Sequence, residues 1–107
     1  MNNPSNIFLK KKILIYGLGK SGISAFKFLN NKSEVYLYDD YHSNFQIKEI
    51  KKRLITFKSI SKLNFDKIIL SPGVNINKCK LTKFLKENKE KIYSDLDIFY
   101  SFYQNRC

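Results

Sequence analysis

The sequence is poor in the residues from which metal sites and disulfide frameworks are built. Its two cysteines, Cys79 and Cys107, lack the spacing of metal ligands, and His42 is the one histidine that could join them. We therefore expect neither a zinc site nor a disulfide scaffold, and free thiols are the default. Long apolar runs are also missing, because lysines at 10–12 interrupt the N-terminal segment. No signal peptide or membrane span is expected, and we predict a soluble, cytoplasmic protein.

Acidic residues are scarce beside basic ones, with 9 Asp and Glu against 20 Lys and Arg and a formal net charge of +11. Such an excess is typical of many nucleic-acid-binding proteins. Here, however, the lysines are spread over every predicted element, which favours an ordinary solvated surface. No nucleic-acid-binding motif accompanies the charge. We expect no nucleic-acid partner, although the positive charge would favour a diphosphate ligand.

The sequence does contain a glycine-rich turn placed between a predicted strand and a predicted helix. The apolar residues 13–16 end at Gly17, and Gly19 and Gly22 complete the pattern G-x-G-x-x-G. In a nucleotide-binding turn the first glycine allows a tight bend and the second lets the backbone approach a diphosphate. The third permits close packing of helix on strand. The amide groups and the positive dipole end of the new helix then face the anion.

Strands and helices alternate along the chain, as the spacing of apolar residues indicates. Strands are predicted at 12–16, 34–39, 67–71 and 92–93, with a further short one near 54–57; helices are predicted at 21–30, after a capping box at Ser43 and Gln46, around Leu81–Leu85, and from Ser94 onward. Residues 59–65 give no clear pattern. We predict one α/β domain, residues 1–107 with an ordered core from about 11 to 103, with a Rossmann-like, doubly wound, mostly parallel sheet of about five strands.

The closing helix has apolar residues at helical spacing, and we expect Leu96, Phe99, Tyr100 and Tyr103 to share its buried face. This aromatic cluster is interpreted as core and inter-domain packing rather than as a platform for stacked bases.

Three loops should converge at the carboxyl ends of the strands, where open α/β sheets bind their ligands: 17–22, 39–41 and 71–75. The amides of Lys20 and Ser21, with the Ser21 hydroxyl, are candidates for holding a phosphate; the alternative is that Ser21 only caps the helix. Asp39 has the sequence separation from the glycines at which an acid accepts hydrogen bonds from a ribose or base in this kind of fold. The alternative is that Asp39 is an ordinary solvated acid in a turn. Gly73 lies in a loop that presents backbone groups to a sugar or forms a rigid turn.

Catalytic machinery is not evident. Lys20-Ser21 looks like the end of an ATP-binding P-loop, but Leu14 occupies the position where that motif requires its first glycine. No nucleophile or second base accompanies His42. We therefore expect no catalytic residue, metal site or cofactor in this chain.

Four segments together resemble the N-terminal domain of the Mur ligases: residues 15–22, the Asp39-Asp40 pair, Ser-Pro-Gly at 71–73, and the Asp-Leu-Asp-Ile-Phe run at 95–99. Among these ligases the chain is most similar to those that add D-glutamate to UDP-N-acetylmuramoyl-L-alanine. The resemblance covers about residues 11–103. It implies a domain that binds the UDP part of a muramoyl substrate rather than NAD.

The resemblance also implies roles for individual residues. Substrate-binding positions would be Gly17, Gly19, Lys20, Ser21 and Gly22 around the diphosphate and uracil, Asp39 and Asp40 at the uracil–ribose end, and Gly73 on the sugar side. Many relatives have a small hydroxyl residue and then a basic one after the first aspartate. Asp40 and Tyr41 occupy those positions here, which is a departure from the family pattern.

In this family ATP, magnesium and acyl-phosphate formation belong to a central domain, and much of the amino-acid site belongs to a third. We find the motif of neither in these 107 residues. The expectation is a peptidoglycan-precursor ligase's substrate-binding domain that packs on a central domain and binds without catalysing. The alternative is an NAD(H)-binding module of a dehydrogenase or regulatory protein, because the glycine turn and Asp39 also satisfy that fingerprint.

Overall fold

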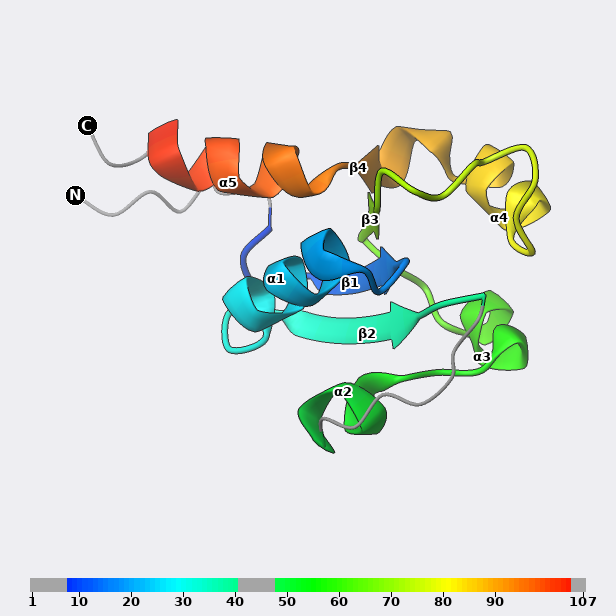
Figure 1. Ribbon diagram of the computed structural model, residues 1–107, viewed down its shortest axis with the longest axis horizontal. Coiled ribbons are helices and arrows are strands. Elements are labelled where there is room, and N and C mark those ends of the chain that lie inside the picture. The colour runs from blue at the N-terminus through cyan, green and yellow to red at the C-terminus, as the bar shows by residue number, and fades with distance from the viewer. Residues whose placement is uncertain (1–7, 41–47, 105–107) are drawn as a thin grey trace.

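The strands form one sheet in which all neighbours run parallel. The computed structural model describes residues 8–40 and 48–104, and within them the strand order is β2-β1-β3-β4 (Figure 1). The strands are β1 (Lys12–Tyr16), β2 (Glu34–Tyr38), β3 (Lys67–Leu70) and β4 (Ile92–Tyr93). Their partners follow parallel registers throughout, such as Ile13 with Val35 and Ile13 with Lys67. The predicted α/β class and parallel sheet are confirmed.

Helices connect successive strands. They are α1 (Lys20–Leu29), α2 (Lys48–Arg53), α3 (Phe57–Lys62), α4 (Thr82–Glu87), the short 3-10 helix η1 (Lys89–Lys91) and α5 (Asp95–Gln104). The patternless segment 59–65 contains most of α3, whose first turn is capped by the Thr56 hydroxyl accepting the Ser59 N–H at 3.2 Å. The predicted capping box at Ser43 and Gln46 lies outside the described residues.

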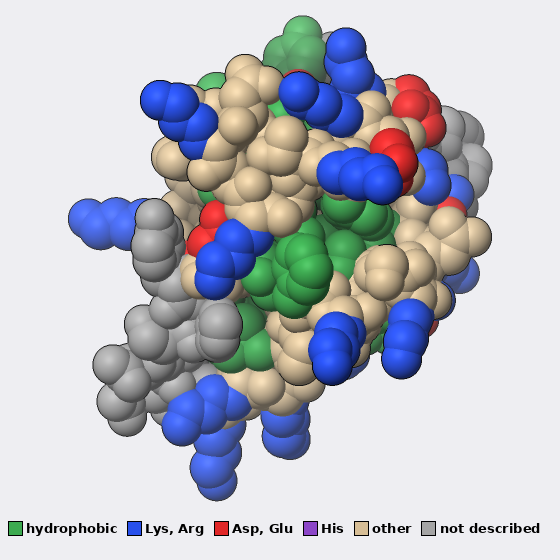
Figure 2. Space-filling view, turned by 90° about the vertical axis from the view of Figure 1, so that its right-hand side faces the viewer, with side chains coloured by type: hydrophobic (Ala, Val, Ile, Leu, Met, Phe, Trp, Pro, Cys, Tyr) green, Lys and Arg blue, Asp and Glu red, His purple; other side chains and the backbone are tan. Residues whose placement is uncertain are grey.

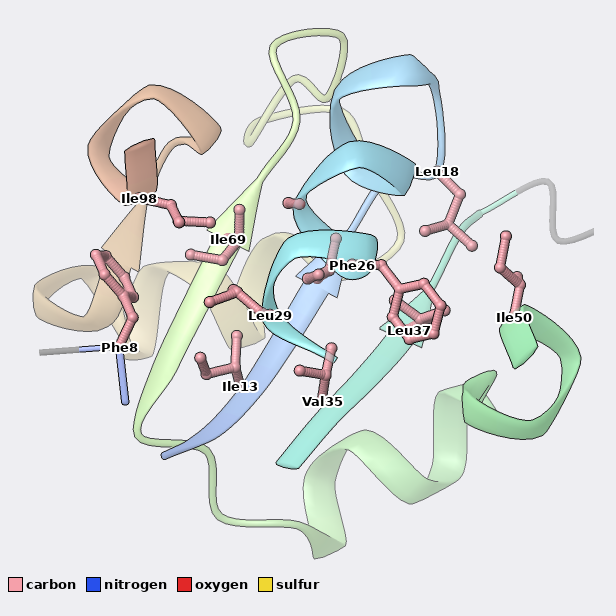
Figure 3. Close-up of a cluster of buried hydrophobic side chains, with 12 residues drawn as sticks. Phe8, Ile13, Leu18, Phe26, Leu29, Val35, Leu37, Ile50, Ile69 and Ile98 are labelled. Carbon is pink, nitrogen blue, oxygen red and sulfur yellow. The ribbon is translucent and has the colours of Figure 1, made fainter. Parts of the chain in front are cut away.

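Both faces of the sheet are buried, which is why the strands are apolar at nearly every position. Side chains alternate between the faces along β1, with Ile13 and Ile15 on one side and Leu14 and Tyr16 on the other. The first face packs against Ala25, Phe26 and Leu29 of α1 and against Ile98 of α5 (Figure 3); the second packs against α3 and α4 through Ile60, Leu81 and Leu85. Helices on both faces make the fold doubly wound.

Among the described residues the sheet has four strands instead of the expected five or so. The segment near 54–57 pairs with β2 only through one isolated parallel bridge, between Leu37 and Leu54. Beyond that bridge the chain turns at Thr56 into α3, so the residues that would have extended a strand are used to cap a helix.

The buried face of α5 also differs from the prediction. Ile98 is fully buried, whereas Leu96 and Tyr100 are 72% and 65% exposed. Phe99 is half-buried and packs edge-on against Phe28, with ring centroids 5.2 Å apart. Because α5 itself carries apolar residues on several of its sides, their periodicity alone could not select the face that meets the sheet.

Candidate functional site

Gly17 follows β1 and has a backbone conformation that favours glycine, with φ of +96°. A Cβ at this position would lie 2.8 Å from the Cβ of Ser71, which is closer than real Cβ contacts. Ser71 in turn donates its buried hydroxyl to the Gly17 carbonyl oxygen at 2.7 Å. The turn after β1 is therefore fastened directly to the loop after β3.

The other two glycines have opposite surroundings. A Cβ on Gly22 would lie 2.0 Å from the Gly17 carbonyl oxygen, so α1 packs directly on the turn that precedes it. A Cβ on Gly19 would meet no atom within 4 Å, and this residue caps α1 without any side-chain hydrogen bond. The first-turn amides of a helix have no partner within it, so the backbone around Gly19 offers an open anion-binding surface.

Asp39 lies directly after β2 and is bonded to the glycine turn. Its Oδ2 accepts the backbone N–H of Leu18 at 2.7 Å, and the Gly17 N–H donates to the Tyr38 carbonyl at 2.9 Å. The strand-end acid that the sequence predicted thus lies beside the glycines, and it fixes the path of the backbone between the first and second of them.

Asp40 connects to a third segment. Its Oδ1 accepts the Tyr16 hydroxyl at 2.6 Å, and its Oδ2 accepts the backbone N–H of Lys80 at 3.3 Å. The Lys80 ammonium donates to the Asp40 carbonyl oxygen, also at 3.3 Å. Asp40 thereby joins the ends of β1 and β2 to the loop that leads into α4.

These loops enclose a cavity of about 490 Å³ at the carboxyl edge of the sheet. The predicted site residues that line it are Gly17, Gly19, Lys20, Ser21, Asp39, Asp40 and Gly73. Gly22 is the exception, because it is buried in the first turn of α1. This edge faces the viewer in Figure 2, where lysine and arginine side chains surround an area of hydrophobic ones.

Sequence reasoning missed three further residues that line the cavity: Tyr16, Lys78 and Cys79. Tyr16 was interpreted only as part of a buried strand, but its hydroxyl reaches the strand end and meets Asp40. Lys78 and Cys79 belong to the polar stretch between Ser71 and Leu81, which has no helical pattern. That missing pattern was the one available signal that the stretch folds back over the strand ends.

The electrostatics of the cavity suit an anionic ligand. Lys20 and Lys78 line it, and both acidic side chains already accept hydrogen bonds from the protein. Burial raises the pKa of the Tyr16 phenol well above its ordinary value, and the hydrogen bond to Asp40 and the neighbouring Cys79 raise it further. Tyr16 is therefore a neutral donor to the Asp40 carboxylate at physiological pH. Within residues 8–40 and 48–104, no group of three or more His, Cys, Asp or Glu could hold a metal ion.

Removing the Ser71 hydroxyl tests the bond between the two loops. We expect Ser71→Ala to lower the free energy of unfolding by about 1–2 kcal/mol, because the buried Gly17 carbonyl loses its hydrogen-bond donor. Urea denaturation monitored by circular dichroism measures the change. Ser61→Ala is the control, since that hydroxyl bonds the Lys58 carbonyl on the exposed surface of α3. Equal stabilities for the two variants would contradict the assigned role of Ser71.

A parallel sheet of order 2-1-3-4, helices on both faces and a glycine turn at the carboxyl edge together define a Rossmann-like α/β domain. None of its helices, among the described residues, has both the length and the apolar character to cross a membrane. Residues 11–93 match the family described as "Mur ligase MurD-like, N-terminal domain", and the chain belongs to that family.

Similar proteins carry the name UDP-N-acetylmuramoylalanine–D-glutamate ligase. That of Rickettsia prowazekii is 40% identical over 103 residues, that of Rickettsia felis 37% over 106, and that of Lachnoclostridium phytofermentans 33% over 105. The matches cover 94%, 94% and 89% of this chain, respectively, and 23% of each relative. The chain thus spans about a quarter of the length of these relatives. No solved structure matches it.

Proposed function

We propose that this chain is the domain of a peptidoglycan-precursor ligase that binds UDP-N-acetylmuramoyl-L-alanine, the substrate to which D-glutamate is added. The observation that carries this proposal is the family match over residues 11–93, strengthened by relatives that are named for that reaction. The cavity supports it as well, because predicted diphosphate, nucleoside and sugar positions line one continuous space.

The proposed contacts follow from the geometry of the cavity. The amides that begin α1 at Lys20 and Ser21, the Ser21 hydroxyl and the open backbone at Gly19 would hold the diphosphate. Gly17 and Gly22 would allow the tight turn and the close packing of α1 that place these groups. Asp39 would lie at the uracil–ribose end, and Gly73 would lie on the sugar side.

The chemical step would lie outside this domain. ATP and magnesium would be held by a central domain on which this one packs, and we propose that residues 1–107 form a single binding unit that is inactive alone. The lack of a nucleophile–base pair and of a P-loop glycine at Leu14 supports this division. We propose that the enzyme is cytoplasmic, and the reaction for which the relatives are named supports this because it uses a nucleotide-linked precursor.

A backbone NMR titration of the 107-residue chain tests the proposal. UDP-N-acetylmuramoyl-L-alanine is expected to shift the amides of residues 17–22, Asp39 and Gly73, while NADH leaves them unchanged. Shifts with NADH alone would favour a dinucleotide-binding module instead, since the glycine turn and Asp39 fit both ligands. The absence of shifts with either ligand would contradict binding by this domain alone.

A further inference from the structure

Asp40 is the residue at which the three loops of the cavity meet. It follows β2, it is bonded to Tyr16 at the end of β1, and it is bonded twice to Lys80 in the segment after β3. These bonds join residues that are 24 and 40 positions apart in sequence. Val74, Ile76 and Cys79 pack against the core on this side of the sheet, and the bonds of Asp40 add polar contacts to this apolar packing.

The two oxygens of the Asp40 carboxylate are both engaged by the protein. Oδ1 receives the hydroxyl of Tyr16, which is 1% exposed, and Oδ2 receives a backbone amide. The Tyr16 bond at 2.6 Å has the length of a charge-assisted bond from a hydroxyl to a carboxylate, whereas the Lys80 bonds at 3.3 Å are long. Tyr16 is thus the stronger partner, and it fixes where the carboxylate lies.

The charge of Asp40 would be unfavourable as a direct ligand contact. A carboxylate that lines a cavity for a diphosphate repels it, and the cost falls when donors already neutralise that carboxylate. The Tyr16 hydroxyl and the Lys80 backbone amide donate to this carboxylate, while the Lys80 ammonium donates to the Asp40 carbonyl oxygen next to it. The bonded carboxylate contributes to the site by positioning the loop that carries Gly73 and Lys78.

We propose that Asp40 is a positioning residue: through Tyr16 and Lys80 it holds the 71–81 loop against the ends of β1 and β2, and it acts on the bound nucleotide through that loop, not by contact. This inference rests on the proposed function for the identity of the ligand. The tether itself is a property of the free protein, and each part has its own test.

The tether is tested without ligand by comparing the amide spectra of Asp40→Ala and Asp40→Asn. The alanine variant is expected to shift the amides of residues 73–81 and to speed their hydrogen exchange, while β4 and α5 keep their signals. The asparagine variant has one acceptor oxygen instead of two, so it can accept from Tyr16 or from the Lys80 amide but not from both, and it is expected to shift residues 76–81 less than alanine does. If Asp40→Ala leaves residues 76–81 unchanged, the loop is held by other contacts and the proposal fails.

The action on the ligand is tested by calorimetric titration with UDP-N-acetylmuramoyl-L-alanine in a double-mutant cycle of Tyr16→Phe and Asp40→Ala. We expect Asp40→Ala to weaken binding about tenfold, and the double variant to bind within about twofold of it, because the two residues act as one unit. Losses that multiply instead would indicate that Asp40 contacts the ligand independently. A melting temperature within a few degrees of the native protein would accompany the expected loss.

Asp66→Ala is the matched control. Asp66 is also an aspartate that accepts a backbone amide, that of Lys12 at 2.9 Å, but it lies at the amino end of β1. Its replacement is expected to leave affinity unchanged, and an equal loss would mean that any lost aspartate bond weakens the site. Should the native chain not bind the UDP-sugar at all, the proposed function fails, while the ligand-free spectra still decide the tether.

Discussion

Gly22→Ala is expected to lower the free energy of unfolding by about 2 kcal/mol or more, although alanine is the better helix former. Alanine in place of glycine within a helix gains about 1 kcal/mol from intrinsic propensity. Its Cβ would lie 2.0 Å from the Gly17 carbonyl oxygen, which is backbone and cannot rotate away. Overpacking of this kind costs about 1–3 kcal/mol and occasionally more, and a contact this short belongs at the upper end. The steric cost therefore exceeds the gain.

Gly19→Ala is the matched comparison in the same turn. Its Cβ would meet no atom within 4 Å, so stability is expected to change by less than about 1 kcal/mol, the usual scale of a helix-cap substitution. On the proposed function the same methyl group would occupy the space where the diphosphate approaches, and affinity for UDP-N-acetylmuramoyl-L-alanine is expected to fall at least about tenfold.

Urea denaturation and calorimetric titration of the two variants separate these effects. The expected pattern is an unstable Gly22→Ala protein and a stable Gly19→Ala protein that binds weakly. Equal stabilities would show that α1 does not pack on the turn as described. A stable Gly19→Ala protein with native affinity would instead contradict the proposal that this turn binds the diphosphate, and the description of the fold would be unaffected.

The parts of the fold that the sequence predicts are those encoded locally. The alternation of Val35 and Leu37 with Tyr36 and Tyr38 assigned the two faces of β2 correctly, because side chains in a strand alternate regardless of what packs on them. The glycine turn was predicted for the same reason, since a tight bend and a close helix require glycine within a few residues. Ser94 likewise caps α5 as expected, with its hydroxyl accepting the Asp97 N–H at 3.3 Å.

The parts that escaped prediction depend on contacts between distant residues. The bonds of Asp40 to Tyr16 and Lys80 span dozens of positions, and nothing in the local sequence of Asp40 distinguishes a tethered acid from a ligand-binding one. The face of α5 was misassigned for a related reason. Leu96 and Tyr100 fit a helical stripe as well as Ile98 does, and only the place where the helix meets the sheet decides between them.

Raising the pH above about 10 is expected to destabilise the fold through the buried tyrosines at the strand ends. Burial, then the hydrogen bond to Asp40, then Cys79 raise the pKa of Tyr16 above its ordinary value of 10.0. Burial, followed by the charges of Asp40 and Asp39, also raises the pKa of Tyr38. The unfolded chain therefore releases these protons first. The stability that they contribute is complete below pH 10 and is lost as the pH rises toward the pKa values of the folded state.

Each such tyrosine lowers the free energy of unfolding by about 1.4 kcal/mol per pH unit in that range. Urea denaturation at pH 9, 10 and 11 measures the slope, and Tyr16→Phe is expected to reduce it by about that amount, because phenylalanine has no proton to lose. Tyr100→Phe removes a phenol that is 65% exposed and is the matched control for the loss of a phenol. Lysine deprotonation occurs in the same range but is common to all three proteins, so the difference between them isolates Tyr16. An unchanged slope in Tyr16→Phe would mean that this phenol is not held neutral against Asp40, and the strand-end tether would then lack its stronger bond.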